Sequence, residues 1–430
     1  MKRVVLLTAV FLLVVGGALA QSAPQQPAAP AGRGRGFGTP PVRSPEVGTD
    51  KTVTFRLRAP NATSVAVRGM TQQPIPMQKD DAGVWTATTP PLKPDLYAYT
   101  FVVDGLSIVD PSNPKFRPSY NTASQSAVLV PGEMPWTPLP NVPRGAVAHH
   151  VFQSKVVGDE RDFYVYTPPN YDPKRKQPYP VLVLQHGLGD GANAWTQVGA
   201  ADVILDTLIN QGKAVPMVMV NPLGYGTAAG PADIDRDGML PAYIRTLLEE
   251  VLPQVEKQYN VSTKPTERAI AGLSMGGAEA MLGGLNHLEK FAWLGSFSGA
   301  YNNWVETRPV RSTATPGFGT AAPAAGRGAE GRGEGRGVGA PGGGRGMNLT
   351  LVESEIPVLY PKLDAKSNAQ IKLLWIACGT SDGLIGVNRQ FKKYLDSKGV
   401  KATFTEIPDM GHVWPLWRQN LADFAPLLFK

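Results

Sequence analysis

RAIAGLSMGGAEAML, residues 268–282, joins an apolar run to a helix-like run through the pentapeptide GLSMG (272–276). The pattern G-x-S-x-G is typical of a sharp strand-to-helix turn that leaves the serine side chain exposed. The turn also places the Met275 N–H at a helix N-terminus, where it can stabilise an oxyanion. We therefore predict that Ser274 is a catalytic nucleophile and that Met275 supplies one oxyanion donor.

The segments on either side of this turn predict a parallel sheet. Continuous apolar runs such as YPVLVLQHG (179–187) and AVPMVMVNP (214–222) are typical of strands buried on both faces. A run with helical spacing, ADVILDTLINQG (201–212), lies between them. Strands that alternate with helices predict a doubly wound α/β sheet, whose functional residues lie at the carboxyl ends of the strands.

The strand endings after Ser274 supply candidates for a base. A serine nucleophile needs a base and a carboxylate, and in this kind of fold the order is Ser, then Asp or Glu, then His. Two histidines follow Ser274: His287, in the helix-like run, and His412, in the loop after the strand KATFTEIP (401–408). We predict that His412 is the base because it lies at the carboxyl end of a strand.

The carboxylate that orients this base has two candidates. Asp382 ends the strand IKLLWIACGTSD (371–382), again at a carboxyl end. Asp409 lies in the same loop as His412, and from that position its carboxylate is poorly placed to contact the far side of the imidazole ring. We favour Asp382 and keep Asp409 as the alternative.

The loop HGLGDG (186–191), which follows the run VLVLQ, predicts a second oxyanion donor. Its glycines allow the backbone to approach an acyl oxygen closely, and the Leu188 N–H is the expected donor. We interpret His186 as a structural residue, with a role as a base as the alternative.

Three aromatic residues near these loops are candidates for the walls of a substrate pocket. They are Trp195, Tyr225 and Trp414. Core packing is the alternative for each, because large aromatic side chains are more often buried than exposed to ligands.

Neither metal binding nor cysteine chemistry is predicted. The run DIDRDG (233–238) begins like a calcium loop, but its twelfth position is Ile244, where a bidentate Glu is needed. The single cysteine, Cys378, excludes an intrachain disulfide, and its place within an apolar strand predicts a buried packing thiol. We expect no metal and no cofactor.

The formal net charge of +7 does not describe the folded parts of the chain. Residues 1–20 carry +2, the Pro- and Gly-rich residues 21–45 carry +3, and residues 307–346 carry +4 from six arginines and two glutamates. The charges of these three segments sum to +9, which exceeds the net charge of the whole chain, so the remaining residues carry −2. We therefore predict no nucleic-acid partner, and we predict that 21–45 and 307–346 are disordered tracts.

The first 20 residues are typical of a secretory signal peptide. Lys2 and Arg3 precede an apolar run of twelve residues, and the run Ala-Leu-Ala that ends at Ala20 provides a cleavage site. An uncleaved anchor helix is the alternative, although twelve residues are short for a membrane span. We predict cleavage after Ala20, a secreted or periplasmic protein, and no stable membrane anchoring.

Residues 46–132 predict a small all-β, immunoglobulin-like sandwich. Short alternating runs such as TVTFRLRAP (52–60) and LYAYTFVVDG (96–105) are separated by turn residues. A Pro-rich linker, 133–148, connects this module to the α/β domain, which we place at 149–430.

The α/β domain resembles a known family. Six segments carry the resemblance: HGLGDGANAW (186–195), AGLSMGG (271–277), CGTSDGL (378–384), GHVWPLWRQNLADFAPLLF (411–429), RDFYVYTPPNYD (161–172) and MVNPLGYG (219–226). They are similar to the esterase D-like branch of the α/β-hydrolases. Within that branch they most resemble the feruloyl and acetylxylan esterases of carbohydrate esterase family one. The resemblance implies an α/β-hydrolase fold. It implies triad roles for Ser274, Asp382 and His412, and oxyanion roles for Leu188 and Met275.

The β region is similar to the early-set modules related to glycogen-binding domains. The similarity is carried by VTFRLRAPNATSVAVRG (53–69), DDAGVWTATTPPLKPDLYAYTFVVDG (80–105) and VDPSNP (109–114). Glycogen binders place tryptophans after the second strand and after the Asp-Gly turn, where this chain has MTQQ (70–73) and LS (106–107). We therefore expect the module to pack beside the catalytic domain or to shape its entrance.

These observations predict a secreted serine carboxylic-ester hydrolase. The expected partner is an ester-decorated plant polysaccharide or oligosaccharide, from which the enzyme releases hydroxycinnamoyl or acetyl groups. A siderophore (enterobactin-type) esterase is one alternative, and a carbohydrate-binding protein with a vestigial hydrolase domain is another.

Overall fold

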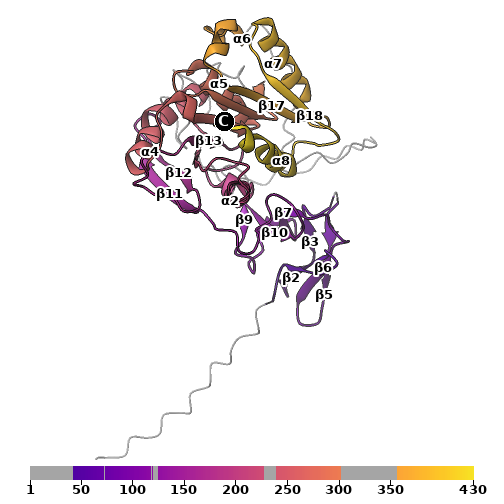
Figure 1. Ribbon diagram of the computed structural model, residues 1–430. Coiled ribbons are helices and arrows are strands. Elements are labelled where there is room, and N and C mark those ends of the chain that lie inside the picture. Colours follow the sequence, from indigo (N-terminus) through magenta and orange to yellow (C-terminus); the bar gives the residue numbers. More distant parts are fainter. Residues whose placement is uncertain (1–41, 72, 118, 120–123, 227–238, 302–355) are drawn as a thin grey trace, which may run out of the picture. The chain divides into compact units, whose positions relative to one another are not determined.

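The strand that precedes Ser274 lies inside a sheet of eight strands, with neighbours on both sides (Figure 1). The computed structural model describes residues 42–71, 73–117, 119, 124–226, 239–301 and 356–430. In sheet order the strands are β11 (Ala146–Gln153), β12 (Glu160–Thr167), β14 (Val218–Pro222), β13 (Val181–Gln185), β15 (Arg268–Leu273), β16 (Trp293–Phe297), β17 (Leu373–Gly379) and β18 (Thr403–Ile407).

Strand direction in this sheet sets where functional residues can meet. The strands from β14 through β18 pair in parallel, while β11 and β12 are antiparallel to their neighbours. The carboxyl ends of β13, β15, β17 and β18 therefore share one edge of the sheet. Each run predicted as a strand forms one of these elements, but the prediction that KATFTEIP (401–408) is buried is wrong: β18 is an edge strand whose residues are exposed or half-buried.

Both faces of the inner strands β13, β14, β15 and β16 are buried, as their continuous apolar runs require. On β13, Val181 and Val183 pack into one hydrophobic cluster, and Leu182 and Leu184 pack into the other. The helices are α1 (Ala194–Gln197), α2 (Ala201–Asn210), α3 (Met239–Thr246), α4 (Leu252–Gln258), α5 (Met275–Asn286), α6 (Ile356–Leu359), α7 (Ile385–Ser397) and α8 (Trp414–Phe424). Side chains of α4, α5 and α7 fill the first cluster and those of α2 and α8 the second, which confirms the doubly wound architecture.

The run YIRTLLEEVLPQVEKQY (243–259), whose apolar residues have helical spacing, does not form one continuous α-helix. A π-helical turn, Leu247–Val251, separates α3 from α4. Pro253, near the start of α4, has no N–H to donate to the carbonyl group four residues earlier. The widened turn therefore lies next to the one residue that cannot continue the regular ladder of hydrogen bonds.

Residues 46–130 form the predicted all-β sandwich. One sheet has the order β1 (Glu46–Val47), β2 (Val53–Arg58), β6 (Val84–Thr88), β5 (Gln78–Lys79); the other has the order β4 (Ile75–Pro76), β3 (Val65–Arg68), β7 (Asp95–Val103), β10 (Gln125–Val130), β9 (Phe116–Arg117), and β8 (Leu106–Ile108) pairs with β7. Phe55 lies between the sheets, with its ring centroid 4.6 Å from that of Tyr99 and 6.3 Å from that of Phe101. Alternating apolar residues thus form the core of the sandwich.

The segment predicted as a linker is packed against the α/β domain. Trp136 is buried among the side chains of α2 and α8, and its Nε1 donates a hydrogen bond to Asp95 on β7 (3.1 Å). Strand β11 begins at Ala146, three residues before the expected start of the α/β domain at residue 149. The described residues belong to one compact unit, Val42–Lys430.

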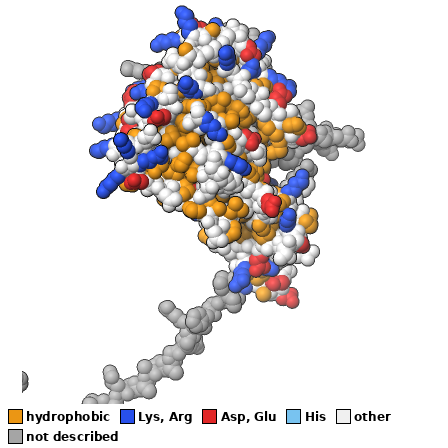
Figure 2. Space-filling view, viewed as in Figure 1, with side chains coloured by type: hydrophobic (Ala, Val, Ile, Leu, Met, Phe, Trp, Pro, Cys, Tyr) orange, Lys and Arg blue, Asp and Glu red, His pale blue; other side chains and the backbone are white. Residues whose placement is uncertain are grey.

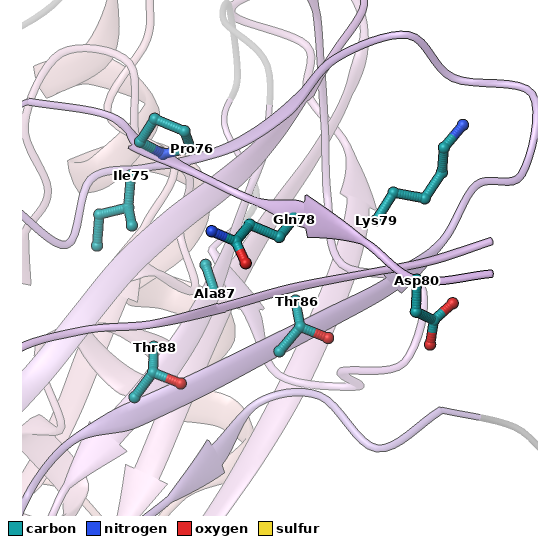
Figure 3. A pocket seen from close by; sticks show the side chains of 8 residues that line it. All are labelled: Ile75, Pro76, Gln78, Lys79, Asp80, Thr86, Ala87 and Thr88. Atoms are coloured by element: carbon teal, nitrogen blue, oxygen red, sulfur yellow. The ribbon is translucent and has the colours of Figure 1, made fainter. Parts of the chain in front are cut away.

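The surface carries charges of both signs. Figure 2 shows Lys and Arg side chains along the periphery of the face in view, with Asp and Glu among them and hydrophobic side chains across its middle. A hollow of about 510 Å³ lies on the sandwich, and Figure 3 shows its lining side chains, which are Ile75, Pro76, Gln78, Lys79, Asp80, Thr86, Ala87 and Thr88. None of these eight is aromatic, so this hollow offers a sugar ring no stacking partner.

Several predictions concern residues outside the described part of the chain. They are the signal peptide 1–20, most of the tract 21–45, the run 233–238 and the insert 307–346. Among the helices that the structure describes, none is both long enough and apolar enough to cross a lipid bilayer.

Candidate functional site

Ser274 occupies a strained turn between β15 and α5. Its backbone has φ 52° and ψ −116°, a conformation that residues with a side chain rarely adopt. The turn is fixed by hydrogen bonds from the Ser274 N–H to the Phe297 carbonyl (2.9 Å) and from the Ala300 N–H to the Ser274 carbonyl (2.9 Å). A Cβ on Gly276 would collide with the carbonyl oxygen of His186, which explains the second glycine of the motif.

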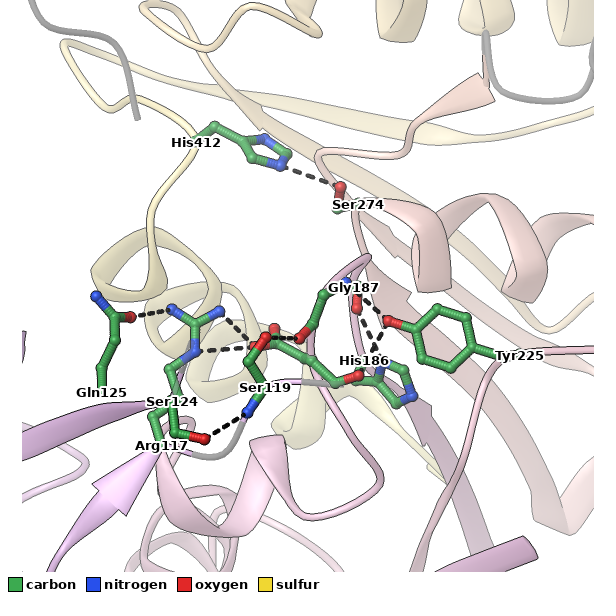
Figure 4. A network of polar contacts seen from close by, with 11 residues as sticks. Arg117, Ser119, Ser124, Gln125, His186, Gly187, Tyr225, Ser274 and His412 are labelled. Atoms are coloured by element: carbon green, nitrogen blue, oxygen red, sulfur yellow. Dashed lines mark hydrogen bonds and ion pairs between the residues drawn. The ribbon is translucent and has the colours of Figure 1, made fainter. Parts of the chain in front are cut away.

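His412 and Asp382 lie in line with this serine. The His412 Nε2 is 3.0 Å from the Ser274 Oγ, as Figure 4 shows, and its Nδ1 is 2.9 Å from the Asp382 Oδ2. His412 comes from the loop between β18 and α8, and Asp382 from the loop after β17. A hydroxyl, an imidazole and a carboxylate in this order form the arrangement that activates serine for attack on a carbonyl.

The carboxyl group behind the imidazole is that of Asp382. Its side chain is fully buried, and its Oδ1 also accepts a hydrogen bond from the Leu384 N–H (2.8 Å). Burial raises the pKa of Asp382, but the hydrogen bond and charge of His412, together with hydrogen bonds from Leu384 and Ser298, outweigh burial, so this pKa lies below its ordinary value. Asp409, the alternative, is exposed, and its backbone N–H donates to the Thr380 Oγ1 (2.9 Å).

Two backbone N–H groups lie beside the serine. Met275 is the first residue of α5, so its N–H has no acceptor within the helix. A Cβ built on Gly187 lies 3.4 Å from the Ser274 Cβ, which places the loop 186–191 against the nucleophile. No described residue accepts a hydrogen bond from the Leu188 N–H. The arrangement can therefore direct two N–H donors at an oxyanion.

His186 and Tyr225 support this loop from inside the protein. The His186 Nε2 accepts a hydrogen bond from the Gly224 N–H (2.9 Å), which leaves its Nδ1 to donate to the Gly187 carbonyl (2.8 Å). Burial lowers the pKa of His186 and keeps the ring neutral. The Tyr225 hydroxyl accepts from the Gly189 N–H (2.7 Å) and donates to the Asp190 carbonyl (3.0 Å).

The three aromatic candidates for pocket walls are buried instead. Trp195 is 0% exposed, its Nε1 donates to the Gln185 carbonyl (2.8 Å), and its ring packs edge-on against Trp414 (5.2 Å between centroids). A ring that no solvent reaches cannot contact a substrate, so the prediction for Trp195 is corrected to core packing. Trp414 and Tyr225 are 7% and 4% exposed and are likewise held within the fold.

Two residues that the sequence did not single out also contact the loop 186–191. They are Ser119 and Arg117, at the end of β9 in the sandwich. Their partners lie about 70 residues away along the chain, so no local pattern marks them. Cys378, by contrast, is buried as predicted, and burial raises the pKa of its thiol to about 12.

Glu279, in the middle of α5, is a buried carboxyl that the arrangement does not use. It is 0% exposed, and its Oε1 has no hydrogen-bond partner among the described residues. The Gln185 amide, with its nitrogen turned toward α5, donates to the Glu279 Oε2 (2.9 Å). Burial raises the pKa of Glu279 well above its ordinary value, which favours the neutral, protonated form of this carboxyl group.

This buried carboxyl predicts a pH-dependent gain in stability for Glu279→Gln. An unfolded chain releases the Glu proton near pH 4.3, whereas the folded chain, with its raised pKa, keeps the proton to a higher pH. Folding therefore becomes less favourable as pH rises from the unfolded pKa toward the folded one. The Gln side chain has no proton to release, so the stability of the variant lacks this pH dependence. The difference in free energy of unfolding between variant and wild type should therefore grow by up to about 1.4 kcal/mol per pH unit above pH 4.3. Urea denaturation at pH 4.5 and 7.5 measures it.

The matched control is Glu289→Gln, at a side chain that is 63% exposed, and it should show no such growth. An equal loss of stability in Glu279→Gln at both pH values would contradict the neutral state of Glu279.

Two family models match the chain. The model described as "Putative esterase" matches residues 154–428, more than half of the chain. The model described as "Carbohydrate-binding module 48 (Isoamylase N-terminal domain)" matches residues 38–115. The gap between the two matches, residues 116–153, contains the last two strands of the sandwich, β9 and β10, and the first strand of the eight-stranded sheet, β11.

Relatives cover different shares of the chain. The endo-1,4-beta-xylanase/feruloyl esterase of Xylanibacter ruminicola is 27% identical over 398 residues, which are 90% of this chain and 46% of that protein. The chain therefore spans less than half the length of this relative.

Among solved structures, a CE1 ferulic acid esterase from Anaeromyces mucronatus matches with a TM-score of 0.50 and 20% identity, over 70% of this chain and 96% of that one. The enterobactin esterase of Shigella flexneri matches with a TM-score of 0.54 and 20% identity, over 87% of this chain and 93% of that one. At such identities the likeness shows the fold alone.

Proposed function

The chain belongs to the esterase family, and we propose that it is an exported serine carboxylic-ester hydrolase whose catalytic residues are Ser274, His412 and Asp382. One observation carries the proposal: the Ser274 hydroxyl, the His412 imidazole and the Asp382 carboxylate are joined by hydrogen bonds of 3.0 and 2.9 Å. Export is proposed from the signal-like residues 1–20.

The proposed reaction has two halves. The Ser274 Oγ attacks the ester carbonyl while His412 takes the hydroxyl proton, and Asp382 stabilises the imidazolium that forms. His412 then gives the proton to the departing alcohol, which leaves an acyl group on Ser274. Water, deprotonated by His412, attacks this acyl-enzyme and releases the acid, and the proton returns to Ser274.

The charge that develops on the carbonyl oxygen needs donors placed in advance. We assign this role to the N–H groups of Leu188, in the loop that packs against Ser274, and of Met275, the first residue of α5. A donor of this kind contributes to the transition state more than to substrate binding, because the negative charge exists only during attack.

The proposed substrate is a hydroxycinnamoyl or acetyl ester on a plant polysaccharide. Support comes from the similarity to the endo-1,4-beta-xylanase/feruloyl esterase of Xylanibacter ruminicola and from the match of residues 38–115 to a carbohydrate-binding module. A siderophore esterase is the second candidate, because the enterobactin esterase structure covers 87% of this chain, both domains included.

A substrate panel tests the proposal. The intact chain is assayed with p-nitrophenyl acetate, methyl ferulate, feruloylated arabinoxylan fragments and a ferric catecholate trilactone, and treated with a fluorophosphonate probe. We expect turnover of the first three and covalent labelling of Ser274, because an activated serine reacts with such electrophiles. Turnover of the trilactone in preference to the feruloyl esters favours the second candidate, and turnover of none contradicts both.

A further inference from the structure

The loop Gly187–Gly191 has little rigidity of its own. Three of its five residues are glycines, and Gly189 has φ +87°, so its backbone has many accessible conformations in isolation. An oxyanion donor is effective only if it is already in place when charge develops. The position of the Leu188 N–H therefore depends on what the rest of the protein does to this loop.

Part of the support reaches the Leu188 N–H directly. Because a peptide group is planar, the direction of the Gly187 carbonyl fixes the direction of the Leu188 N–H on the same peptide. That carbonyl accepts hydrogen bonds from the His186 Nδ1 (2.8 Å) and from the Asp190 N–H (3.1 Å). Whatever holds Asp190 in place thus also helps to orient the donor.

Asp190 is held by the sandwich. The Arg117 Nε donates to the Asp190 Oδ1 (2.9 Å), and the Arg117 Nη2 forms an ion pair with the same oxygen. The Asp190 side chain is only 3% exposed, and a buried carboxylate needs such a partner. Arg117 is in turn placed by β9, where it pairs with Gln125 on β10.

A second sandwich residue holds the peptide group between Gly189 and Asp190. The Ser119 Oγ donates to the Gly189 carbonyl (2.7 Å), while the Gly189 N–H donates to the Tyr225 hydroxyl (2.7 Å). Figure 4 shows Arg117 and Ser119 reaching the loop from the side opposite Tyr225, with Ser274 and His412 above the loop in this view. The loop is therefore held from two sides, and one of them belongs to the other domain.

We propose that Arg117 and Ser119 are positioning residues that hold the oxyanion loop in its reactive conformation, which makes the sandwich a working part of the active site. The proposal rests on the proposed function, because it takes the Leu188 N–H as an oxyanion donor. It assigns the module a role that its likeness to a carbohydrate-binding module does not imply, and the role needs no glycan contact.

Kinetics of the intact chain provide the first test. Arg117→Ala is expected to lower kcat by about tenfold to a hundredfold and to change KM by less than about threefold, because a misplaced donor acts on the transition state. Arg117→Lys keeps the charge without the two-point contact and should recover part of the loss. Arg56→Ala is the matched control: it removes an exposed pair with Glu46 in the other sheet and should leave kcat unchanged.

Amide hydrogen exchange provides a test that needs no activity. Residues 186–195 of Arg117→Ala should exchange at least about tenfold faster than in the wild type, and those of Arg56→Ala should not. If Arg117→Ala fails to fold, Ser119→Ala takes its place, since it removes the uncharged hydrogen bond to the Gly189 carbonyl and leaves the charge of Asp190 paired.

Unchanged exchange together with unchanged kcat would overturn the proposal, and so would a raised KM at unchanged kcat. If the wild type cleaves no ester, the proposed function fails and exchange alone decides whether the sandwich orders the loop.

Discussion

Replacing Ser274 with alanine is expected to lower kcat for ester hydrolysis by about 10⁶-fold, as loss of the nucleophile does in serine hydrolases generally. The residual rate reflects the oxyanion donors and substrate binding, which the substitution leaves in place. The fold should tolerate the change, because alanine is no larger than serine and occupies the same strained backbone (φ 52°) at no extra cost. Initial rates with p-nitrophenyl acetate measure the effect, and thermal unfolding checks the fold.

The partner substitution shows whether the two side chains act as a unit. His412→Ala alone should lower kcat to a similar extent, and the double variant should fall little further than either single one, because neither group works without the other. Ser397→Ala, at an exposed serine whose Oγ donates to the Tyr394 carbonyl, is the matched control and should match the wild type. Additive losses in the double variant would contradict a joint role for Ser274 and His412.

The order of Ser274, Asp382 and His412 along the chain, and the place of each after an apolar run, were sufficient to predict their meeting. The physical reason is that β15, β17 and β18 are parallel, so their carboxyl ends must share one edge. Strand direction can be read from local patterns combined with a general rule of topology. The predictable part of the site is therefore the part that strand direction determines.

Contacts that depend on packing could not be predicted in this way. Trp195 comes shortly after the loop 186–191, yet its ring turns into the core, and only the arrangement of α2 and α8 determines that. Arg117 and Ser119 lie at or just after a strand of two residues in another domain, and their partners are specified by how the domains meet. Contacts between two domains leave no hydrophobic period, motif or composition in the sequence from which they could be predicted.

The domains also meet at a buried ion pair between Asp95 on β7 and Arg418 on α8. The Arg418 side chain is 0% exposed and that of Asp95 is 12% exposed. The guanidinium also donates to the carbonyls of Leu96 (3.1 Å) and Val198 (3.0 Å), so it bridges both domains. Because α8 begins two residues after His412, this pair also anchors the helix next to the proposed base.

Asp95→Ala is expected to lower the free energy of unfolding by about 3–5 kcal/mol, because it leaves the Arg418 charge buried without a counterion. Urea denaturation at pH 7 measures the loss. Glu406→Ala, which breaks the exposed pair with Arg389, is the matched control and should cost about 1 kcal/mol or less.

Removing both charges together should cost much less than removing one. Burial lowers the pKa of Arg418 to about 10, and burial also raises the pKa of Asp95, despite their mutual attraction. For both groups the loss of hydration therefore outweighs the pairing, and apolar side chains of similar size avoid that loss. The combined variant Asp95→Leu with Arg418→Met should regain most of the stability that Asp95→Ala loses. A combined variant less stable than Asp95→Ala would show instead that the hydrogen bonds of Arg418 to Leu96 and Val198 hold the domains together.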